Sequence, residues 1–153
     1  MRLGIISDTH GLLRPEALEA LGGVNLIVHA GDVGDPGILA KLKAIAPVFA
    51  VRGNIDTQAW AEGLPETTVV EANRTSLYLL HNLKRLDLKP EAAGFQAVVS
   101  GHTHEPKQYE RNGVLYLNPG SAGPRRFHLP VTLAILETTK RPLRAEILPL
   151  LPS

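Results

Sequence analysis

Seven potential metal ligands occur in short segments that each follow a run of apolar, β-type residues. They are two aspartates, one asparagine and four histidines: Asp8, His10, Asp32, Asn54, His81, His102 and His104. Carboxylate, amide and imidazole groups, in a chain without cysteine, form a ligand set that suits first-row divalent metals rather than iron–sulfur or copper(I) sites. Seven donors are too many for one tetrahedral ion but about right for two ions that share a bridging group. The residues therefore predict a two-metal centre, an arrangement that hydrolases use on phosphate esters.

The elements that must position these ligands are strands. Apolar runs end just before the ligand segments at 3–6, 26–28, 48–51, 77–80 and 97–99. In an open α/β sheet, ligands bind outside the carboxyl ends of the strands. Five strands would therefore bring the seven side chains to one place.

The first half of the chain alternates between strand and helix patterns. We expect strands at 2–6, 25–29 and 48–51, and helices from 14 to 21 and from 36 to before Pro47. Asp35 is the expected N-cap of the second helix, and Pro15 falls in the first turn of the first helix, where its missing N–H costs nothing. This order predicts a βαβαβ unit with parallel strands and right-handed crossovers.

The second half is dominated by strand patterns. We expect a hairpin of strands 67–71 and 75–80 around a turn at Asn73-Arg74, a short helix at 90–93, and strands at 97–100, 107–111, 114–117, 131–137 and 143–150. The last four strands are expected to complete a second sheet. The fold class is therefore α/β, a two-sheet mixed α/β sandwich with flanking helices.

The ordered segments resemble those of a known family. Asp-x-His, Gly-Asp, Gly-Asn, His and Gly-His-x-His, followed by Asn118-Pro119-Gly120-Ser121, resemble the calcineurin-like metallophosphoesterases, and most closely the small single-domain bacterial and archaeal phosphodiesterases. The resemblance extends from Ile5 to the strand that ends at Glu137. It implies the four-layer metallophosphoesterase fold and a metal-dependent phosphoric ester hydrolase, a phosphodiesterase.

The resemblance also implies which residue binds which ion. Asp8, His10, Asp32 and His104 would hold one ion, while Asp32, Asn54, His81 and His102 would hold the other, so Asp32 would bridge. Asp32, Asn54 and His81 are the implied catalytic residues. Of the divalent ions that accept this ligand set, we expect Mn²⁺, with Ni²⁺, Fe²⁺, Co²⁺ and Zn²⁺ as alternatives. The predicted reaction is hydrolysis of a small phosphodiester or nucleotide-like substrate by a metal-bridging hydroxide.

Substrate contacts are expected from Asn54 and from two arginines. Arg125 and Arg126 follow the Asn-Pro-Gly-Ser segment and could clamp a phosphate bidentately, although exposed arginines are usually just solvated. Ile55 occupies the position of the leaving-group histidine of larger relatives such as the phosphoprotein phosphatases. A general acid normally contributes 10²–10⁴-fold, so we expect a preference for leaving groups that depart easily. Asp56 is expected to fix the loop.

Three histidines need separate interpretation. His29 lies within a strand and is expected to be a packed residue that orients the loop rather than a ligand. His102 and His104 flank Thr103, and on an extended segment their side chains would share one face, which favours chelation over core packing.

Length and charge limit the remaining possibilities. The chain has 153 residues, which indicates a single domain over 1–153. The net charge is +1 and the sixteen basic residues are scattered, so no extended nucleic-acid surface is expected. No transmembrane-length run and no basic leader precede the first strand, so we expect a cytoplasmic protein without membrane contact. Strands 131–136 and 143–151 could lie at an edge and form a homodimer or homotetramer.

Two alternatives to a phosphodiesterase stay open. One is a phosphomonoesterase or nuclease with the same metal site. The other is a non-catalytic protein-binding scaffold, because one eukaryotic relative of this fold serves as a protein-sorting subunit. The sequence leaves open the physiological substrate, the native metal and the source of any leaving-group acid.

Overall fold

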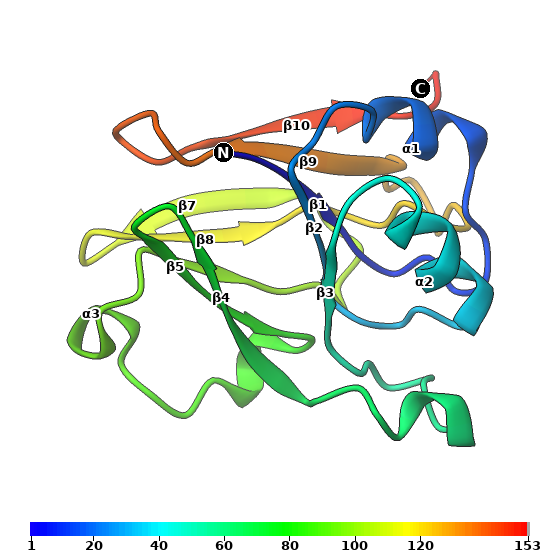
Figure 1. Ribbon diagram of the computed structural model, residues 1–153, viewed down its shortest axis with the longest axis horizontal. Helices are drawn as coiled ribbons and strands as arrows, with labels where there is room; N and C mark the ends of the chain where they lie inside the picture. Colours follow the sequence, from blue (N-terminus) through cyan, green and yellow to red (C-terminus); the bar gives the residue numbers. More distant parts are fainter. Residues whose placement is uncertain (153) are drawn as a thin grey trace.

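Ten strands form two packed five-stranded sheets in the computed structural model, which describes residues 1–152 (Figure 1). The first sheet has the order β10-β9-β1-β2-β3, with strands at Ala145–Pro149, Thr132–Glu137, Arg2–Ile6, Leu26–His29 and Val48–Ala50. The second has the order β4-β5-β6-β8-β7, with strands at Thr67–Ala72, Thr75–Leu80, Ala97–Val99, Val114–Asn118 and Lys107–Arg111. The predicted two-sheet mixed α/β sandwich is confirmed.

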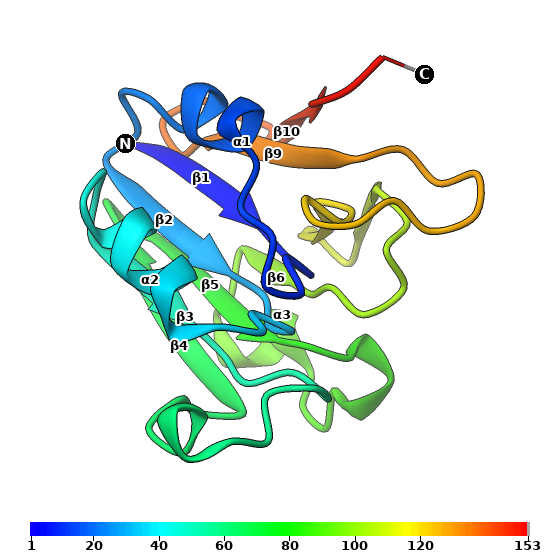
Figure 2. The same cartoon turned by 90° about the vertical axis from the view of Figure 1, so that its right-hand side faces the viewer.

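The predicted βαβαβ unit is present. Strands β1, β2 and β3 pair in parallel and are connected by α1 (Pro15–Ala20) and α2 (Pro36–Lys43). Pro15 opens α1, and the carboxylate of Asp35 caps α2 by accepting from the backbone N–H of Gly37 at 2.7 Å. Figure 2 shows both helices on the outer side of the first sheet, where their buried residues pack against Ile6 and Ile27.

Strands β9 and β10 correct one prediction, because they join the first sheet and not the second. Strand β9 pairs antiparallel with β1, with Leu3 opposite Leu136, and β10 pairs with β9. Residues 132–136 are all buried, as is typical of a strand covered on both faces. The expectation that 131–136 lies at an edge is therefore wrong, whereas β10 is the edge strand.

The core has three layers of side chains. Between the sheets lie apolar residues of both, among them Ile5, Leu79 and Leu136. A second cluster fills the space between the first sheet and its helices. The outer face of the second sheet is covered by the segment 83–95, which contains the 3₁₀ turn Leu83–Arg85 and the short helix α3 (Pro90–Ala93). No helix within residues 1–152 has the length and apolarity needed to cross a membrane.

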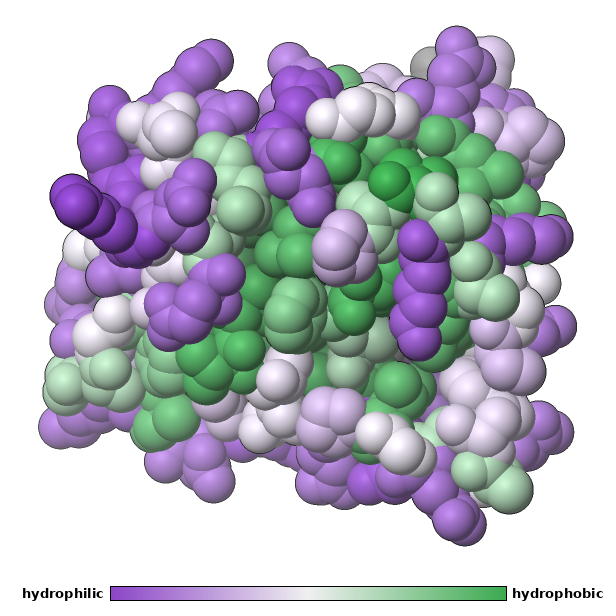
Figure 3. Space-filling model, in the orientation of Figure 1, coloured by the Kyte–Doolittle hydropathy of each residue, from purple (hydrophilic) through white to green (hydrophobic). Residues whose placement is uncertain are grey.

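Edge strands β3 and β4 lie beside each other on one side of the sandwich. In the orientation of Figure 1, apolar side chains gather on this surface (Figure 3). Phe49 of β3 and Val69 of β4 are 39% and 44% exposed. A further 3₁₀ turn, Ala59–Ala61, lies in the connection between these strands.

Candidate metal centre

The loop after β1 lies against the loop after β2. The backbone N–H of Asp8 donates to the carbonyl of Gly31 at 3.0 Å, and that of His10 donates to the carbonyl of Asp32 at 2.9 Å. These bonds continue the parallel pairing of β1 with β2 beyond the strand ends. Three predicted ligands therefore leave the same edge of the first sheet.

The carboxylate of Asp56 ties the loop after β3 to the loop after β2. It accepts from the backbone N–H groups of Val33 at 3.1 Å, Gly34 at 2.9 Å and Gly53 at 2.9 Å, and the residue is buried. Because Gly53 directly precedes Asn54, these bonds fix the Asn54 segment. The interpretation of Asp56 as a loop-fixing residue is confirmed.

The loops of the second sheet reach those of the first through Asp8. The N–H of Gly101 donates to the carbonyl of His81 at 2.9 Å, which joins the loops after β6 and β5. The N–H of His102 donates to Oδ2 of Asp8 at 3.1 Å, and the hydroxyl of Ser7 donates to the same oxygen at 2.7 Å. Asp8 is fully buried, so its carboxylate connects the two sheets from the inside.

Five of the seven predicted ligands have a left-handed backbone, with φ between 47° and 74°: Asp8, His10, Asp32, His102 and His104. Such φ values are uncommon for residues other than glycine and cost on the order of 1–3 kcal/mol each. Non-glycine residues of this kind cluster at active sites and ligand clamps. The expectation of an extended segment around Thr103 is wrong, because this backbone bends at both histidines.

The two carboxylates lie among three imidazoles. Oδ1 of Asp8 is 3.4 Å from Nε2 of His104 and 3.8 Å from Nε2 of His10. Oδ2 of Asp32 is 3.5 Å from Nε2 of His10 and 3.2 Å from Nε2 of His81. The carboxylate of Asp32 thus lies between a histidine of the first sheet and one of the second.

The other two predicted ligands lie at the margin of this cluster. The ring of His102 is exposed, and its centroid is 5.2 Å from that of His81. Asn54 and His81 line the same hollow, which has a volume of about 690 Å³. Two compact groups of ligand atoms lie within 4.8 Å of one another: Asp8, His10 and His104, and Asp8, Asp32 and His81. The structure therefore brings five predicted ligands into direct proximity and leaves His102 and Asn54 beside them.

Four buried ligand atoms have no hydrogen-bond partner among residues 1–152: Oδ1 of Asp8, Nε2 of His10, Nε2 of His81 and Nδ1 of His104. Unpaired buried polar groups are costly and each needs an explanation, such as an ion. All four atoms belong to residues of the two compact groups. The cluster therefore fits divalent metal ions, for which nitrogen and oxygen donors are appropriate ligands.

Both carboxylates favour the charged form. Burial raises the pKa of Asp8, but the nearby His10 and His104 and the hydroxyl of Ser7 outweigh it and hold that pKa well below its usual range. Burial likewise raises the pKa of Asp32, but His81 and the N–H of Ile55 lower it further. Two anionic groups therefore face the imidazoles, as a cation site requires.

The ring of His81 is oriented by a backbone carbonyl. Its Nδ1 lies 2.7 Å from the carbonyl oxygen of Ala30, so Nδ1–H is the donor in the neutral ring and the lone pair of Nε2 faces Asp32. Burial lowers the pKa of His81, but Asp32 outweighs this and raises it. This arrangement presents Nε2 to the centre of the cluster.

His29 supports the loops, as predicted. It is fully buried, its Nδ1 accepts from the N–H of Gly31 at 3.1 Å, and its Nε2 is 3.0 Å from the hydroxyl of Thr9. That hydroxyl donates to the carbonyl of Val33. Burial lowers the pKa of His29 to about 4.

Arg125 and Arg126 are exposed, and within residues 1–152 neither forms a hydrogen bond or ion pair with a predicted ligand. The guanidinium of Arg125 donates to the carbonyl of Pro152 at 3.0 Å. The segment before them is closer, because the hydroxyl of Ser121 donates to the carbonyl of Asp8 at 3.0 Å. A substrate role for either arginine stays a prediction.

Two residues make supporting hydrogen bonds that were not predicted from the sequence, although Asn118 belongs to the Asn-Pro-Gly-Ser segment noted there. Ser7 donates to the ligand carboxylate of Asp8, and a hydroxyl adjacent to that carboxylate in the chain was the available signal. Asn118 donates from Nδ2 to the carbonyl of Gly101 at 2.9 Å and to the hydroxyl of Thr103 at 3.1 Å. These contacts join Asn118 to residues 17 and 15 positions earlier in the chain, so a local sequence pattern does not predict them.

Comparisons with known proteins agree with this site. The calcineurin-like phosphoesterase superfamily domain matches residues 1–141. A probable metallophosphoesterase of Methanothermobacter thermautotrophicus is 36% identical over 163 residues, covering 97% of this chain and 92% of the relative. A solved archaeal phosphodiesterase has a TM-score of 0.80 at 26% identity, over 97% of this chain and 100% of the other. Vps29 of Entamoeba histolytica complexed with Zn²⁺ has a TM-score of 0.74 at 21% identity, over 99% of this chain and 100% of the other, and shows the fold alone.

Proposed function

The chain belongs to the calcineurin-like phosphoesterase superfamily, and on that premise we propose that it is a metal-dependent phosphodiesterase with a dinuclear centre. The observation that carries the proposal is the set of buried carboxylate and imidazole atoms that converge without hydrogen-bond partners within residues 1–152. The similarity to an archaeal phosphodiesterase supports the choice of reaction. The proposal takes the chain as one catalytic domain, because the ligands come from both sheets.

The proposed ligand assignment is the one that the family resemblance implies. Asp8, His10 and His104 would hold one ion and Asn54, His81 and His102 the other, with Asp32 shared between them. The place of Asp32 between His10 and His81 supports its shared role. Bound divalent ions would supply Lewis acidity toward the phosphate and lower the pKa of the attacking water.

The protein groups position the substrate and balance its charge. Two carboxylates among neutral imidazoles and an amide leave the loaded centre net positive, which suits an anionic diester. Asn54 lines the hollow beside His81 and would donate its amide to a phosphate oxygen. Ile55, which is 44% exposed, offers no proton to a leaving group. The proposed substrate is therefore a small or nucleotide-like diester whose leaving group departs without an acid from this position.

The test is a comparison of two esters that share a good leaving group. The purified protein is stripped of metal, loaded with Mn²⁺ or Ni²⁺, and assayed with bis-p-nitrophenyl phosphate and with p-nitrophenyl phosphate. We expect metal-dependent turnover that favours the diester, and its loss in His104→Ala.

His128→Ala is the matched control, because His128 is exposed and belongs to neither compact ligand group. It should retain activity. Preference for the monoester would indicate a phosphomonoesterase instead. Absence of turnover with any metal would overturn the proposal in favour of a protein-binding scaffold.

A further inference from the structure

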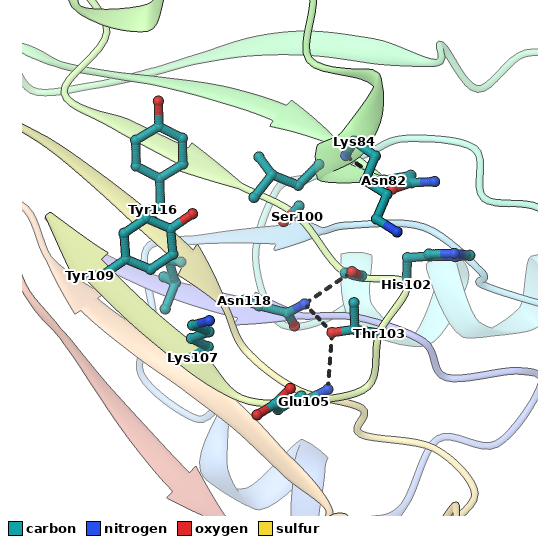
Figure 4. Close-up of a pocket in the computed structure, with 13 residues that line it drawn as sticks. Asn82, Lys84, Ser100, His102, Thr103, Glu105, Lys107, Tyr109, Tyr116 and Asn118 are labelled. Atoms are coloured by element: carbon teal, nitrogen blue, oxygen red, sulfur yellow. Dashed lines mark hydrogen bonds between the residues drawn. The ribbon is translucent and has the colours of Figure 1, made fainter. Parts of the chain in front are cut away.

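We propose that a hollow on the outer face of the second sheet binds a planar aromatic group in one ester arm of the substrate. This inference rests on the proposed function, because the hollow opens beside a predicted metal ligand. Its volume is about 590 Å³, within the range of 300–1,000 Å³ typical of small-molecule sites. Figure 4 shows the side chains that surround it.

Strand register places the hollow next to the metal centre. Tyr109 of β7 lies opposite Tyr116 of β8, and nearer the carboxyl end of β8 Lys107 lies opposite Asn118. Alternate residues share a face of a sheet, so all four side chains belong to the outer face. Figure 4 shows this row leading from the tyrosines toward His102.

His102 connects the hollow with the metal centre. Its side chain lines the hollow, and its ring centroid is 5.2 Å from that of His81. Its backbone N–H is held by the carboxylate of Asp8. A phosphate at the centre would therefore have one of its ester arms at the mouth of the hollow.

The far end of the hollow is aromatic. The rings of Tyr109 and Tyr116 are parallel, with an interplanar angle of 1° and centroids 5.2 Å apart. Tyr116 is buried while Tyr109 is half-buried, so the outer ring keeps part of its surface accessible. Leu83 adds an apolar wall. Parallel aromatic rings beside an aliphatic side chain favour a flat apolar group, which gains from stacking as well as from burial.

The rim of the hollow is polar and carries more positive than negative charge. Lys84, Lys107 and Glu105 line it, and Nζ of Lys107 lies 5.6 Å from the centroid of the Tyr109 ring. The ring of Tyr109 therefore lies near both a cation and a second ring. This environment accepts a neutral or electron-rich aromatic group attached to an anionic phosphate.

The hollow on the other side of His81 differs in character. Four charged residues line it beside Tyr78 and Leu80, and two of them form an ion pair at 3.1 Å: Arg52, Glu66, Arg85 and Asp87, with the pair between Arg52 and Glu66. The two sides of the centre therefore offer different surroundings to the two ester arms. Only the side next to His102 combines parallel rings with an aliphatic wall in the described part of the chain.

The experiment measures binding rather than turnover. Phenylphosphonate, cyclohexylphosphonate and methylphosphonate are titrated by calorimetry into Zn²⁺-loaded protein, since Zn²⁺ is diamagnetic and permits NMR. Phenyl and cyclohexyl groups are similar in size but differ in planarity. We expect phenylphosphonate to bind about fivefold more tightly than cyclohexylphosphonate, with NOEs between its ring and Tyr109.

Tyr109→Leu should abolish the phenyl preference. Tyr78→Leu is the matched control, because Tyr78 lies on the same face of the second sheet but lines the other hollow. Circular dichroism and Zn²⁺ titration confirm that both variants fold and bind metal. Equal binding of the phenyl and cyclohexyl ligands, or a phenyl preference that survives in Tyr109→Leu, would overturn the inference.

The outcomes separate this inference from the proposed function. Ring contacts to Tyr109 in a protein without metal-dependent turnover would support the aromatic site and overturn the phosphodiesterase. Metal-dependent turnover together with equal affinity for methylphosphonate and phenylphosphonate would support the phosphodiesterase and overturn the aromatic site. Adenosine 5′-monophosphate distinguishes the source of the ring, since tighter binding than phenylphosphonate assigns a nucleoside arm and weaker binding assigns a simple aryl arm.

Discussion

Asp32 combines two roles in one carboxylate. Oδ2 lies between His10 and His81, while Oδ1 accepts from the backbone N–H of Ile55 at 3.0 Å. One oxygen is therefore held by the loop and the other faces the imidazoles. An amide in its place would keep the size of the side chain and lose its negative charge.

We accordingly expect Asp32→Asn to lower Mn²⁺ affinity by about 100-fold or more and to abolish diester turnover while the fold persists. Calorimetric Mn²⁺ titration, the bis-p-nitrophenyl phosphate assay and circular dichroism measure the three effects. Asp35→Asn is the matched control, because Asp35 is a helix cap for which asparagine is an equally good substitute. Wild-type turnover in Asp32→Asn with metal present would contradict the shared-ligand assignment.

His29 predicts a dependence of stability on pH. Burial lowers the pKa of this fully buried residue from 6.5 to about 4. Below pH 6.5, His29 binds a proton in the unfolded chain but stays neutral in the folded protein. The free energy of unfolding therefore falls as pH decreases toward 4. By linkage, the contribution of His29 to that free energy decreases by about 2 kcal/mol between pH 7 and pH 5.

Urea denaturation of the metal-free protein at both pH values measures this effect against His29→Gln. The wild type should lose about 2 kcal/mol more than the variant over this interval. His81, whose pKa is raised, acts in the opposite sense but is present in both proteins and cancels. An equal loss of unfolding free energy in the two proteins would contradict the lowered pKa of His29.

At the scale of elements, glycines allow the ligand loops to approach one another. A Cβ at Gly101 would lie 2.0 Å from the hydroxyl of Ser7 and 2.6 Å from Oδ2 of Asp8. The loop after β6 therefore packs against the loop after β1 only without a side chain at this position. In the pattern Gly-His-x-His, the glycine thus permits close packing of the two loops, and the histidines are the predicted ligands.

Gly101→Ala should destabilise the protein by about 1–3 kcal/mol and weaken metal binding, because the two loops must separate. For a chain of this size, that cost lowers Tm by roughly 2–12 °C in a thermal melt. Gly63→Ala serves as control, since a Cβ at Gly63 meets no described atom within 4 Å. Equal melting temperatures for the two variants would show that the loop at Gly101 adjusts freely.

Most strands could be predicted from the sequence, but their partners could not. The hairpin around Asn73 and the N-cap Asp35 follow local rules, and both were predicted correctly. The pairing of β9 with β1 joins residues about 130 positions apart, and its apolar pattern fits either sheet equally well. Long-range pairing is decided by packing over the whole core, which no local pattern records.

The same limit applies to the candidate site. The ligand types and their places at strand ends were visible in the sequence, because parallel strands deliver loops to one edge. The left-handed backbone at His102 and His104 was not, since tertiary contacts such as the bond from His102 to Asp8 impose it. The supporting hydrogen bonds of Asn118 were not predicted either, because they too are tertiary contacts.

For the whole molecule, the candidate site is a connection between two sheets. The loops of the first sheet supply Asp8, His10, Asp32 and Asn54, and the loops of the second supply His81, His102 and His104. Bound metal would therefore cross-link two layers that otherwise meet mainly through apolar side chains. Ligands that bind only the folded state stabilise it by mass action.

Removal of metal should therefore lower the stability of the entire fold. At a free metal concentration 100 times Kd, the stabilisation is about 2.7 kcal/mol, which for a domain of this size corresponds to roughly 5–10 °C in Tm. Calorimetric melts with Mn²⁺ and with a chelator measure the difference in the wild type, in His104→Ala and in the control His128→Ala. We expect the shift in the wild type and in the control and its loss in His104→Ala. Because His104 belongs to a loop of the second sheet and its partners Asp8 and His10 belong to the first, an unchanged Tm after chelation would mean that metal does not join the two sheets.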